Sequence, residues 1–486
     1  MKRPGFVSVL LLTAALGSYS AVGLADRINL PSLGDTTSGI ISQQQEYELG
    51  RTWLKVLRSQ TPMMSDPQLK DYLERLVYRL AGASELKDHR LTPLVINSPV
   101  LNAFAAPGGI VGVNTGLFLH AETEAQFAAV LAHELAHLSQ RHYARNVEEA
   151  RNKAIPTAAA ILGSIILMAT AGGDAGAAAL TSTVAGIQSS RLRFSRQFER
   201  EADNLGIQTL VKAGFDPQAM PDIFEQMNKA SRYSSRPPEF LLTHPVTENR
   251  ISDSRARADQ ISKQALNTGK GSLDYQLMRM RAVVLNSSNP HELTKQLTKE
   301  LESGLNGTPE INQYGLVMAH METREYKKAE ALIKPLKQSL PNNLYITMLE
   351  AELAGDMEQF DTAFKRINDA LAISPGNFPL LAIRAQLAIQ KKDYSQAKTE
   401  LTALSRSRPE DPDIWYELAE VQGLDHDILG LHQSRAEFYF LTGNLDDAIK
   451  HLQYAQKMTK DNFALKTKLD KKLADMHSYR QKLKEN

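Results

Sequence analysis

A strict 34-residue period in the C-terminal half constrains the fold of this chain more than any other sequence feature. An aromatic residue is followed three positions later by alanine, at Tyr326 and Ala329, Phe360 and Ala363, and Tyr394 and Ala397. Prolines recur with the same period, at positions 341, 375 and 409. A small alanine lets two helices approach closely, and proline cannot continue a helix. The pattern therefore predicts stacked pairs of helices over residues 270–486.

The period and its landmarks resemble the tetratricopeptide repeat. This resemblance implies a helical solenoid whose concave face binds an extended partner, and the alternative is an irregular helical bundle without a binding role. A later copy, Leu445-Asp-Asp-Ala448, is out of step with the other three. Residues 26–265 are expected to form a separate domain that precedes the repeat domain at 270–486.

The domain at 26–265 is expected to be mainly helical around a small sheet. Helical patterns occur within residues 40–90, over 122–145 and over 197–212. Short apolar runs at 94–96, 102–105 and 110–113 are separated by turn residues and predict strands. The whole chain is therefore predicted to be mainly α, with an α+β domain followed by a helical solenoid.

Charge and cysteine content exclude several classes of protein. The 56 Lys and Arg residues balance 55 Asp and Glu, which leaves a net charge of +1. This balance gives no electrostatic support for a nucleic-acid-binding protein, so we expect no nucleic-acid partner. The chain has no cysteine, which excludes disulfides, thiolate zinc sites and cysteine nucleophiles. A metal site must therefore be built from histidines and carboxylates.

The N-terminus has the pattern of a secretory signal peptide. Lys2 and Arg3 precede an uncharged stretch that ends in Gly23-Leu24-Ala25. We expect residues 1–25 to be removed, so that the mature chain begins near Asp26, and the alternative is an N-terminal membrane anchor. The lack of cysteine suits export to a bacterial periplasm, where thiols are oxidised.

A second apolar stretch, residues 154–187, carries one charged residue, Asp174. Three interpretations stay open for it. It forms a buried or flexible helical hairpin, an element that makes peripheral contact with a membrane or a hydrophobic partner, or a transmembrane span. The first of these is favoured because Pro156 and many small residues interrupt the apolar pattern.

Residues 133–137 read His-Glu-Leu-Ala-His within an apolar stretch. On a helix, His133 and His137 lie one turn apart on one face, so both imidazoles can bind a single Zn²⁺. Glu134 is displaced by about 100° around the helix, where it can act as general base on a zinc-bound water. The alternative is a pair of structural histidines with other partners. The motif predicts a hydrolytic zinc centre with one ion per chain.

A catalytic zinc needs a third protein ligand. His142 is predicted to point away from the metal, because it lies about half a turn around the same helix. Glu199 and Asp203 share one helix face at positions i and i+4. We predict Glu199 as the third ligand and Asp203 as a carboxylate that orients a ligand histidine. Glu201 as the ligand is the alternative.

The His-Glu-x-x-His motif, the later Glu199-x-x-x-Asp203 and the segment from Asn102 to Gly109 together resemble the gluzincin-type metallopeptidases of family M48. The resemblance implies a zincin-like metallopeptidase domain with His133, His137 and Glu199 as zinc ligands and the glutamate of the motif as the catalytic one. With a signal peptide and C-terminal repeats, it also implies a periplasmic protein of outer-membrane quality control. Its implied partners are unfolded or misassembled β-barrel proteins and the β-barrel assembly machinery.

Asn102, Ala103 and Phe104 are predicted to bind substrate. A strand over residues 102–105 at the edge of the sheet would pair with an extended substrate main chain. Such pairing is largely independent of the substrate sequence, which suits a protease of unfolded strands. The alternative is a purely structural strand.

His244 lies in the sequence Leu242-Thr243-His244-Pro245. Three roles compete for it: a hydrogen-bond donor to the oxyanion, a further zinc ligand that displaces water and closes the site, and a surface or helix-capping residue. Our hypothesis is that His244 gates the enzyme.

The predicted function is therefore that of a zinc endopeptidase in outer-membrane protein assembly. The main alternative is a chaperone or adaptor with a mostly structural or repressed zinc site. A peptidoglycan or small-peptide hydrolase is a weaker alternative, because an edge strand and a large solenoid suit polypeptides better.

Overall fold

The computed structural model describes residues 42–152, 195–233, 238–262, 272–304, 307–459 and 462–485. The predicted signal peptide and the whole apolar stretch at 154–187 lie outside these ranges, and so does the boundary predicted at 265–270. Within them, no helix combines the length and the apolar character needed to cross a membrane.

Two N-terminal helices begin at well-formed caps. Helix α1 (Gln43–Gln60) starts with a capping box, in which Ser42 and Gln45 each accept the backbone N–H of the other with their side chains. Helix α2 (Pro67–Ala83) starts at Asp66, whose carboxylate accepts the N–H of Leu69. Both helices bury one apolar face against the rest of the domain predicted at 26–265, which is called the peptidase domain below after the family that its sequence resembles.

The sheet has three described strands, β1 (Thr92–Ile96), β2 (Ala103–Ala106) and β3 (Ile110–Asn114). Their order is β1-β3-β2, with β1 parallel and β2 antiparallel to β3. A tight turn through Gly108 and Gly109, at φ of 79° and 75°, joins β2 to β3. A side chain at Gly109 would meet the carbonyl oxygen of Arg90 at 2.2 Å. Strand β2 therefore lies at the edge of this sheet, as the sequence predicts.

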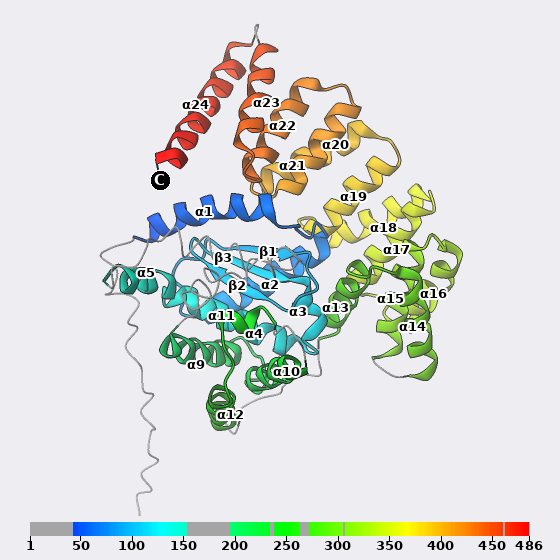
Figure 1. Ribbon diagram of the computed structural model, residues 1–486. Coiled ribbons are helices and arrows are strands. Elements are labelled where there is room, and N and C mark those ends of the chain that lie inside the picture. The colour runs from blue at the N-terminus through cyan, green and yellow to red at the C-terminus, as the bar shows by residue number, and fades with distance from the viewer. Residues whose placement is uncertain are drawn as a thin grey trace, which may run out of the picture.

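Helix α4 (Glu124–Ser139) forms the centre of the peptidase domain (Figure 1). Every residue from Gln126 to His137 is buried, because the helix packs against β2, α2, α9 (Arg196–Lys212) and α10 (Ala219–Tyr233). The helix predicted over 122–145 is wrong at its C-terminal end. The chain turns at Arg141, whose φ of 51° is left-handed, and α5 (His142–Asn152) then begins in a new direction.

The remaining elements of the peptidase domain are short or peripheral. They are α3 (Thr115–His120), α11 (Phe240–Thr243) and α12 (Glu248–Ser262). Helix α12 packs on α9 and α10, while α11 leads directly into His244.

Residues 272–485 form the helical repeats. The helices are α13 (Leu273–Leu285), α14 (Pro290–Ser303), α15 (Pro309–Glu322), α16 (Tyr326–Ser339), α17 (Leu344–Asp356), α18 (Phe360–Ile373), α19 (Phe378–Gln390), α20 (Tyr394–Ser407), α21 (Pro412–Leu424), α22 (Ile428–Leu441), α23 (Leu445–Lys457) and α24 (Phe463–Glu485). The three repeated aromatic residues begin α16, α18 and α20, and the three alanines that follow them are fully buried. The repeated prolines lie two residues beyond these helices. The predicted helical solenoid is thus confirmed.

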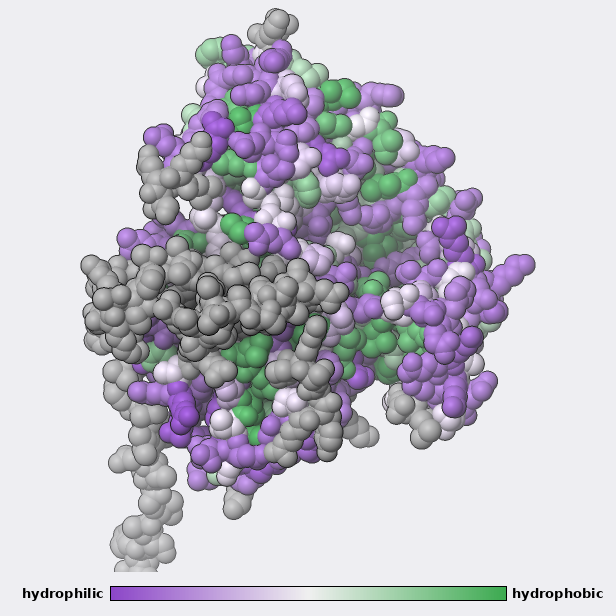
Figure 2. Space-filling model, viewed as in Figure 1, coloured by the Kyte–Doolittle hydropathy of each residue, from purple (hydrophilic) through white to green (hydrophobic). Residues whose placement is uncertain are grey.

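The repeats curve around one side of the peptidase domain (Figure 1). Helix α13 packs on α2 and α3, α19 packs on α2, and α22 reaches α1. On the face shown in Figure 2, the surface of the repeats is mostly hydrophilic, with smaller hydrophobic patches among the hydrophilic residues.

Charged groups join the two parts of the chain. Lys70 Nζ of α2 lies 2.6 Å from Asp411 and 3.0 Å from Asp413, at the start of α21. Arg58 of α1 donates to the backbone carbonyl of Glu410. The repeats are therefore held against the peptidase domain at both α1 and α2.

Candidate metal centre

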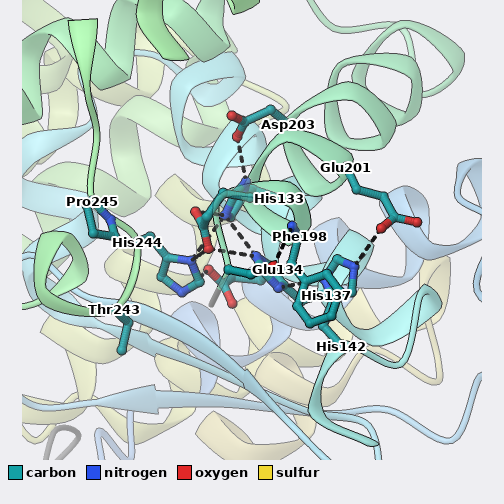
Figure 3. A network of polar contacts seen from close by, with 12 residues as sticks. His133, Glu134, His137, His142, Phe198, Glu201, Asp203, Thr243, His244 and Pro245 are labelled. Carbon is teal, nitrogen blue, oxygen red and sulfur yellow. Dashed lines mark hydrogen bonds and ion pairs between the residues drawn. The ribbon is translucent and has the colours of Figure 1, made fainter. Parts of the chain in front are cut away.

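Four buried side chains from three parts of the peptidase domain converge on one point (Figure 3). Helix α4 supplies His133 and His137, α9 supplies Glu199, and the residue after α11 is His244. One nitrogen or oxygen atom of each lies within 4.8 Å of the others. The distance between His133 Nε2 and His137 Nε2 is 3.1 Å. The Glu199 carboxylate oxygens lie 3.5 Å from the first of these nitrogens and 3.6 Å from the second.

These distances fit a zinc ion. Two donors that each lie about 2.0–2.1 Å from a tetrahedral zinc are about 3.3 Å apart. His244 Nδ1 completes the set, 3.3 Å from His133 Nε2 and 2.9 Å from Glu199 Oε1. Three imidazoles and a carboxylate are donors that zinc binds readily, and their chemistry fits the need for a site without cysteine.

Asp203 lies one turn after Glu199 on α9 and faces the other nitrogen of a clustered histidine. Its Oδ1 is 3.0 Å from His133 Nδ1. Arg250 of α12 binds Asp203 and also places Nη1 2.7 Å from Glu199 Oε2. Burial raises the pKa of Glu199, but the charges of His244 and Arg250 outweigh it and hold that pKa well below its ordinary value. The carboxylate is thus kept ionised, as a metal ligand must be.

Glu134 lies beside the four donors without belonging to them. Its carboxyl is only 1% exposed, and Oε1 is 3.5 Å from His244 Nε2. Burial raises its pKa, and a hydrogen bond from the backbone of Ala105 in β2 opposes this effect. The carboxylate therefore lies between the donor cluster and the edge strand.

The main chain of β2 faces this site at alternate residues. The carbonyl of Asn102 accepts the N–H of Asn114, so the main-chain groups of Asn102, Phe104 and Ala106 face β3, while those of Ala103 and Ala105 face the edge with which no described strand pairs. The side chain of Phe104 packs edge-on against Trp53, at 5.6 Å between ring centroids. The side chain of Asn102 donates to Glu239. Of the three residues predicted to bind substrate, Ala103 therefore offers its main chain to the edge.

His142 and Arg250 contact the site although the sequence analysis gave neither a role there. His142 is not one of the four clustered donors, as predicted, but the reason given was wrong, because His142 does not continue α4 and its Nδ1 lies 2.9 Å from His137 Nδ1. Glu201 does point to another side from Glu199, and it contacts His142 Nε2 at 3.2 Å (Figure 3). The Gln140–Arg141 turn depends on tertiary packing, and helical spacing gives no signal for it.

A paired-histidine helix, a carboxylate from a second helix and a glutamate next to the edge strand of the described sheet define a metallopeptidase. Comparisons with known proteins identify the family. The description "Peptidase family M48" matches residues 67–258, and a tetratricopeptide-repeat description matches residues 356–421. The chain belongs to peptidase family M48, whose metallopeptidases are zinc enzymes, and it carries C-terminal tetratricopeptide repeats.

Several relatives are similar along most or part of this chain. The beta-barrel assembly-enhancing protease of Escherichia coli K12 is 31% identical over 483 residues, which cover 99% of this chain and 98% of its own. The protein of the same name from Yersinia pestis is 33% identical, with 93% of each chain covered. The mitochondrial metalloendopeptidase OMA1 of Schizosaccharomyces pombe is 33% identical over 181 residues, or 37% of this chain and 50% of its own. The protein is accordingly a metalloendopeptidase.

Proposed function

We propose that this chain is a periplasmic zinc endopeptidase that acts in the quality control and assembly of outer-membrane β-barrel proteins. The observation that carries the proposal is the position of Glu134, between a four-donor metal cluster and the main-chain edge of β2 that no described strand covers. The names of the relatives that match nearly the whole chain support the substrate class.

The proposed reaction is hydrolysis of a peptide bond with one zinc ion per chain, held by His133, His137 and Glu199. When bound, the ion supplies Lewis acidity that activates a water and polarises the peptide carbonyl. Glu134 takes the proton of the attacking water and delivers it to the leaving amine. Asp203 and Arg250 hold the ligands in place: the first faces His133 Nδ1, and the second bridges Asp203 and Glu199.

Substrate is proposed to bind as an additional strand. Both main-chain groups of Ala103 and the C=O group of Ala105 face the edge of β2 that no described strand covers, and they can pair with an extended polypeptide. The donor to Glu134 is the backbone of Ala105, so the paired segment would pass directly over the catalytic carboxylate. Unfolded strands of a β-barrel protein suit this kind of recognition.

His244 is proposed to close the site at rest. Its Nδ1 lies within the donor set, so all four protein donors could hold a bound zinc ion, which would then have no open position for water. Catalysis then requires His244 to leave the set. The same observation favours the second candidate function, a chaperone or adaptor in which the zinc site stays repressed.

Export and partners complete the proposal. Removal of residues 1–25 would deliver the mature chain to the periplasm, where the repeats would bind β-barrel proteins and the β-barrel assembly machinery. For residues 154–187, peripheral contact with a membrane stays one of the three interpretations given above.

The substitution Glu134→Gln tests the endopeptidase proposal. It keeps the three proposed zinc ligands and removes the general base, so we expect the purified variant to retain zinc but to lose cleavage of a denatured β-barrel protein. Wild-type protein treated with a chelator provides the control. Cleavage at the wild-type rate would refute the proposed role of Glu134. Full replacement of the wild-type protein in barrel assembly by this variant in cells would favour the adaptor function.

A further inference from the structure

His137 has a second polar contact on the side of its ring that faces away from the donor cluster. Its Nε2 belongs to the cluster, while its Nδ1 lies 2.9 Å from Nδ1 of His142 (Figure 3). The opposite nitrogen of His142, Nε2, lies 3.2 Å from Glu201 Oε2. His137, His142 and Glu201 thus form a continuous chain of polar contacts that leads from the metal cluster to a carboxylate on α9.

The chemistry of these groups fixes the direction of the hydrogen bonds. A histidine that binds a metal through Nε2 carries its proton on Nδ1, so His137 must donate to His142. His142 then accepts with Nδ1 and must carry its own proton on Nε2. That proton is donated to the Glu201 carboxylate, which can only accept when ionised. One tautomer of each imidazole ring is therefore compatible with all the hydrogen bonds from His137 through His142 to Glu201.

His142, the middle residue of this series of polar contacts, is also held in place by packing. The His142 ring is fully buried and stacks on Phe198, with 4.4 Å between ring centroids and 9° between the planes. Arg145 lies over the Phe198 ring and also pairs with Glu201 at 3.1 Å. The left-handed turn at Arg141 brings His142 back toward α4. The position of His142 is therefore determined by packing as well as by its polar partners.

Helix α9 supplies a carboxylate partner for each of the two clustered histidines of α4, one directly and one through His142. Asp203 faces His133 Nδ1 directly, at 3.0 Å. Glu201 lies two residues earlier on α9, on another side of that helix, and it reaches His137 only through His142. Carboxylate partners of this kind fix the tautomer and orientation of a metal-binding histidine, and their loss typically weakens metal binding by about 10–100-fold.

We propose that His142 is a positioning residue that links Glu201 to His137 and so holds the Nε2 lone pair of His137 toward the zinc ion. This inference rests on the proposed zinc site and extends it by one histidine and one carboxylate. It predicts that His142 contributes to zinc affinity without touching zinc or substrate.

The test is the zinc dissociation constant of the full mature chain, measured by competition with a chromophoric chelator. His142→Phe keeps the ring stack on Phe198 but removes the acceptor that His142 Nδ1 offers to the Nδ1–H of His137, and we expect zinc binding about tenfold or more weaker. His142→Asn loses the stack but can place its Oδ1 where Nδ1 was, so its affinity should lie closer to wild type. A residue that only packs would give the opposite order, with Phe tighter than Asn.

His320→Phe is a matched control. This buried histidine of α15 also pairs with a glutamate, Glu325 at 2.8 Å, but it lies in the repeats and should leave zinc affinity unchanged. Wild-type affinity in His142→Phe, or weaker binding by His142→Asn than by His142→Phe, would overturn the proposal.

If the substitutions at the buried residue His142 prevent folding, Glu201→Leu tests the same proposal. Glu201 is partly exposed, and its loss should weaken zinc binding several-fold, whereas an unchanged constant would overturn the proposal. Absence of zinc binding by the wild-type chain would instead refute the zinc site itself.

Discussion

Arg250 binds both carboxylate oxygens of Asp203, with Nε 2.8 Å from Oδ2 and Nη2 2.7 Å from Oδ1. The pair is buried. Asp203 also contacts His133 Nδ1, so the pair lies next to the metal cluster, on the side of His133 that faces away from the other donors. A planar guanidinium is suited to this two-point contact, whereas an ammonium group is a single point charge. The arrangement makes Arg250 a structural counter-ion for two carboxylates of α9.

Loss of Arg250 is expected to destabilise the metal-free protein strongly. Arg250→Met would leave Asp203 and Glu199 buried without their cation, which typically costs about 3–5 kcal/mol. Arg250→Lys should recover part of that loss, because it restores the charge but not the two-point geometry. Urea unfolding of the zinc-free proteins measures both values. A loss below about 1 kcal/mol for Arg250→Met would show that the ion pair is not needed.

Removal of zinc should abolish cleavage and lower stability together. A ligand that binds only the folded state at 100 times its dissociation constant stabilises that state by about 2.7 kcal/mol. Dialysis against a chelator should therefore lower the thermal unfolding midpoint, and added zinc should restore both the midpoint and the cleavage rate. Full cleavage by protein shown by elemental analysis to contain no zinc would contradict the proposed mechanism.

Local periodicity predicts much of the fold and the centre of the site. The 34-residue period places Ala329, Ala363 and Ala397 at buried helix contacts, where the structure has them. Helical spacing also brings His133 and His137 together, and it brings Glu199 and Asp203 to one side of α9. These relations follow from positions four residues apart on one helix, which depend little on tertiary packing.

Contacts between separate elements were not predicted in the same way. His142 follows Arg141, a left-handed residue just beyond the end of α4, and extending the helix through Arg141 gives the ring the wrong direction. Arg250 lies 47 residues from Asp203 in sequence, and nothing in the pattern of α12 distinguishes it from a surface arginine. Such residues are placed by the packing of α5 and α12 on α9, which a single sequence does not encode locally.

His244→Ala distinguishes between closure of the zinc site and stabilisation of the oxyanion, the two roles in the site that the sequence left open for His244. If His244 closes the site, its removal should free one zinc position, and cleavage of an unfolded substrate should rise by about threefold to tenfold as the competent fraction increases. Zinc affinity should fall at the same time, because one donor is lost. A decrease in cleavage with zinc retained would instead assign His244 to oxyanion stabilisation. Unchanged cleavage and affinity would exclude both roles.

Glu417 of α21 should make stability depend on pH in the repeat domain. Burial, together with the negative charge of Asp413, raises the pKa of Glu417 to about 7, above its ordinary value of 4.5. Between these two pH values the folded state binds a proton that the unfolded state has released, so stability falls as pH rises and levels off above about pH 7.

Glu417→Gln should remove this dependence. The neutral amide can still accept the hydrogen bond that Gln386 donates to Glu417 Oε1 at 2.6 Å, so the substitution changes charge with little change in packing. The variant should match wild type in urea unfolding near pH 4.5 and exceed it by about 2–3 kcal/mol at pH 8, as one pKa unit corresponds to about 1.4 kcal/mol. A difference of equal size at both pH values would show that the effect is not protonation. Because Glu417 lies far from His133 and the other donors in sequence and belongs to the repeats, zinc affinity should stay at the wild-type value in the same variant.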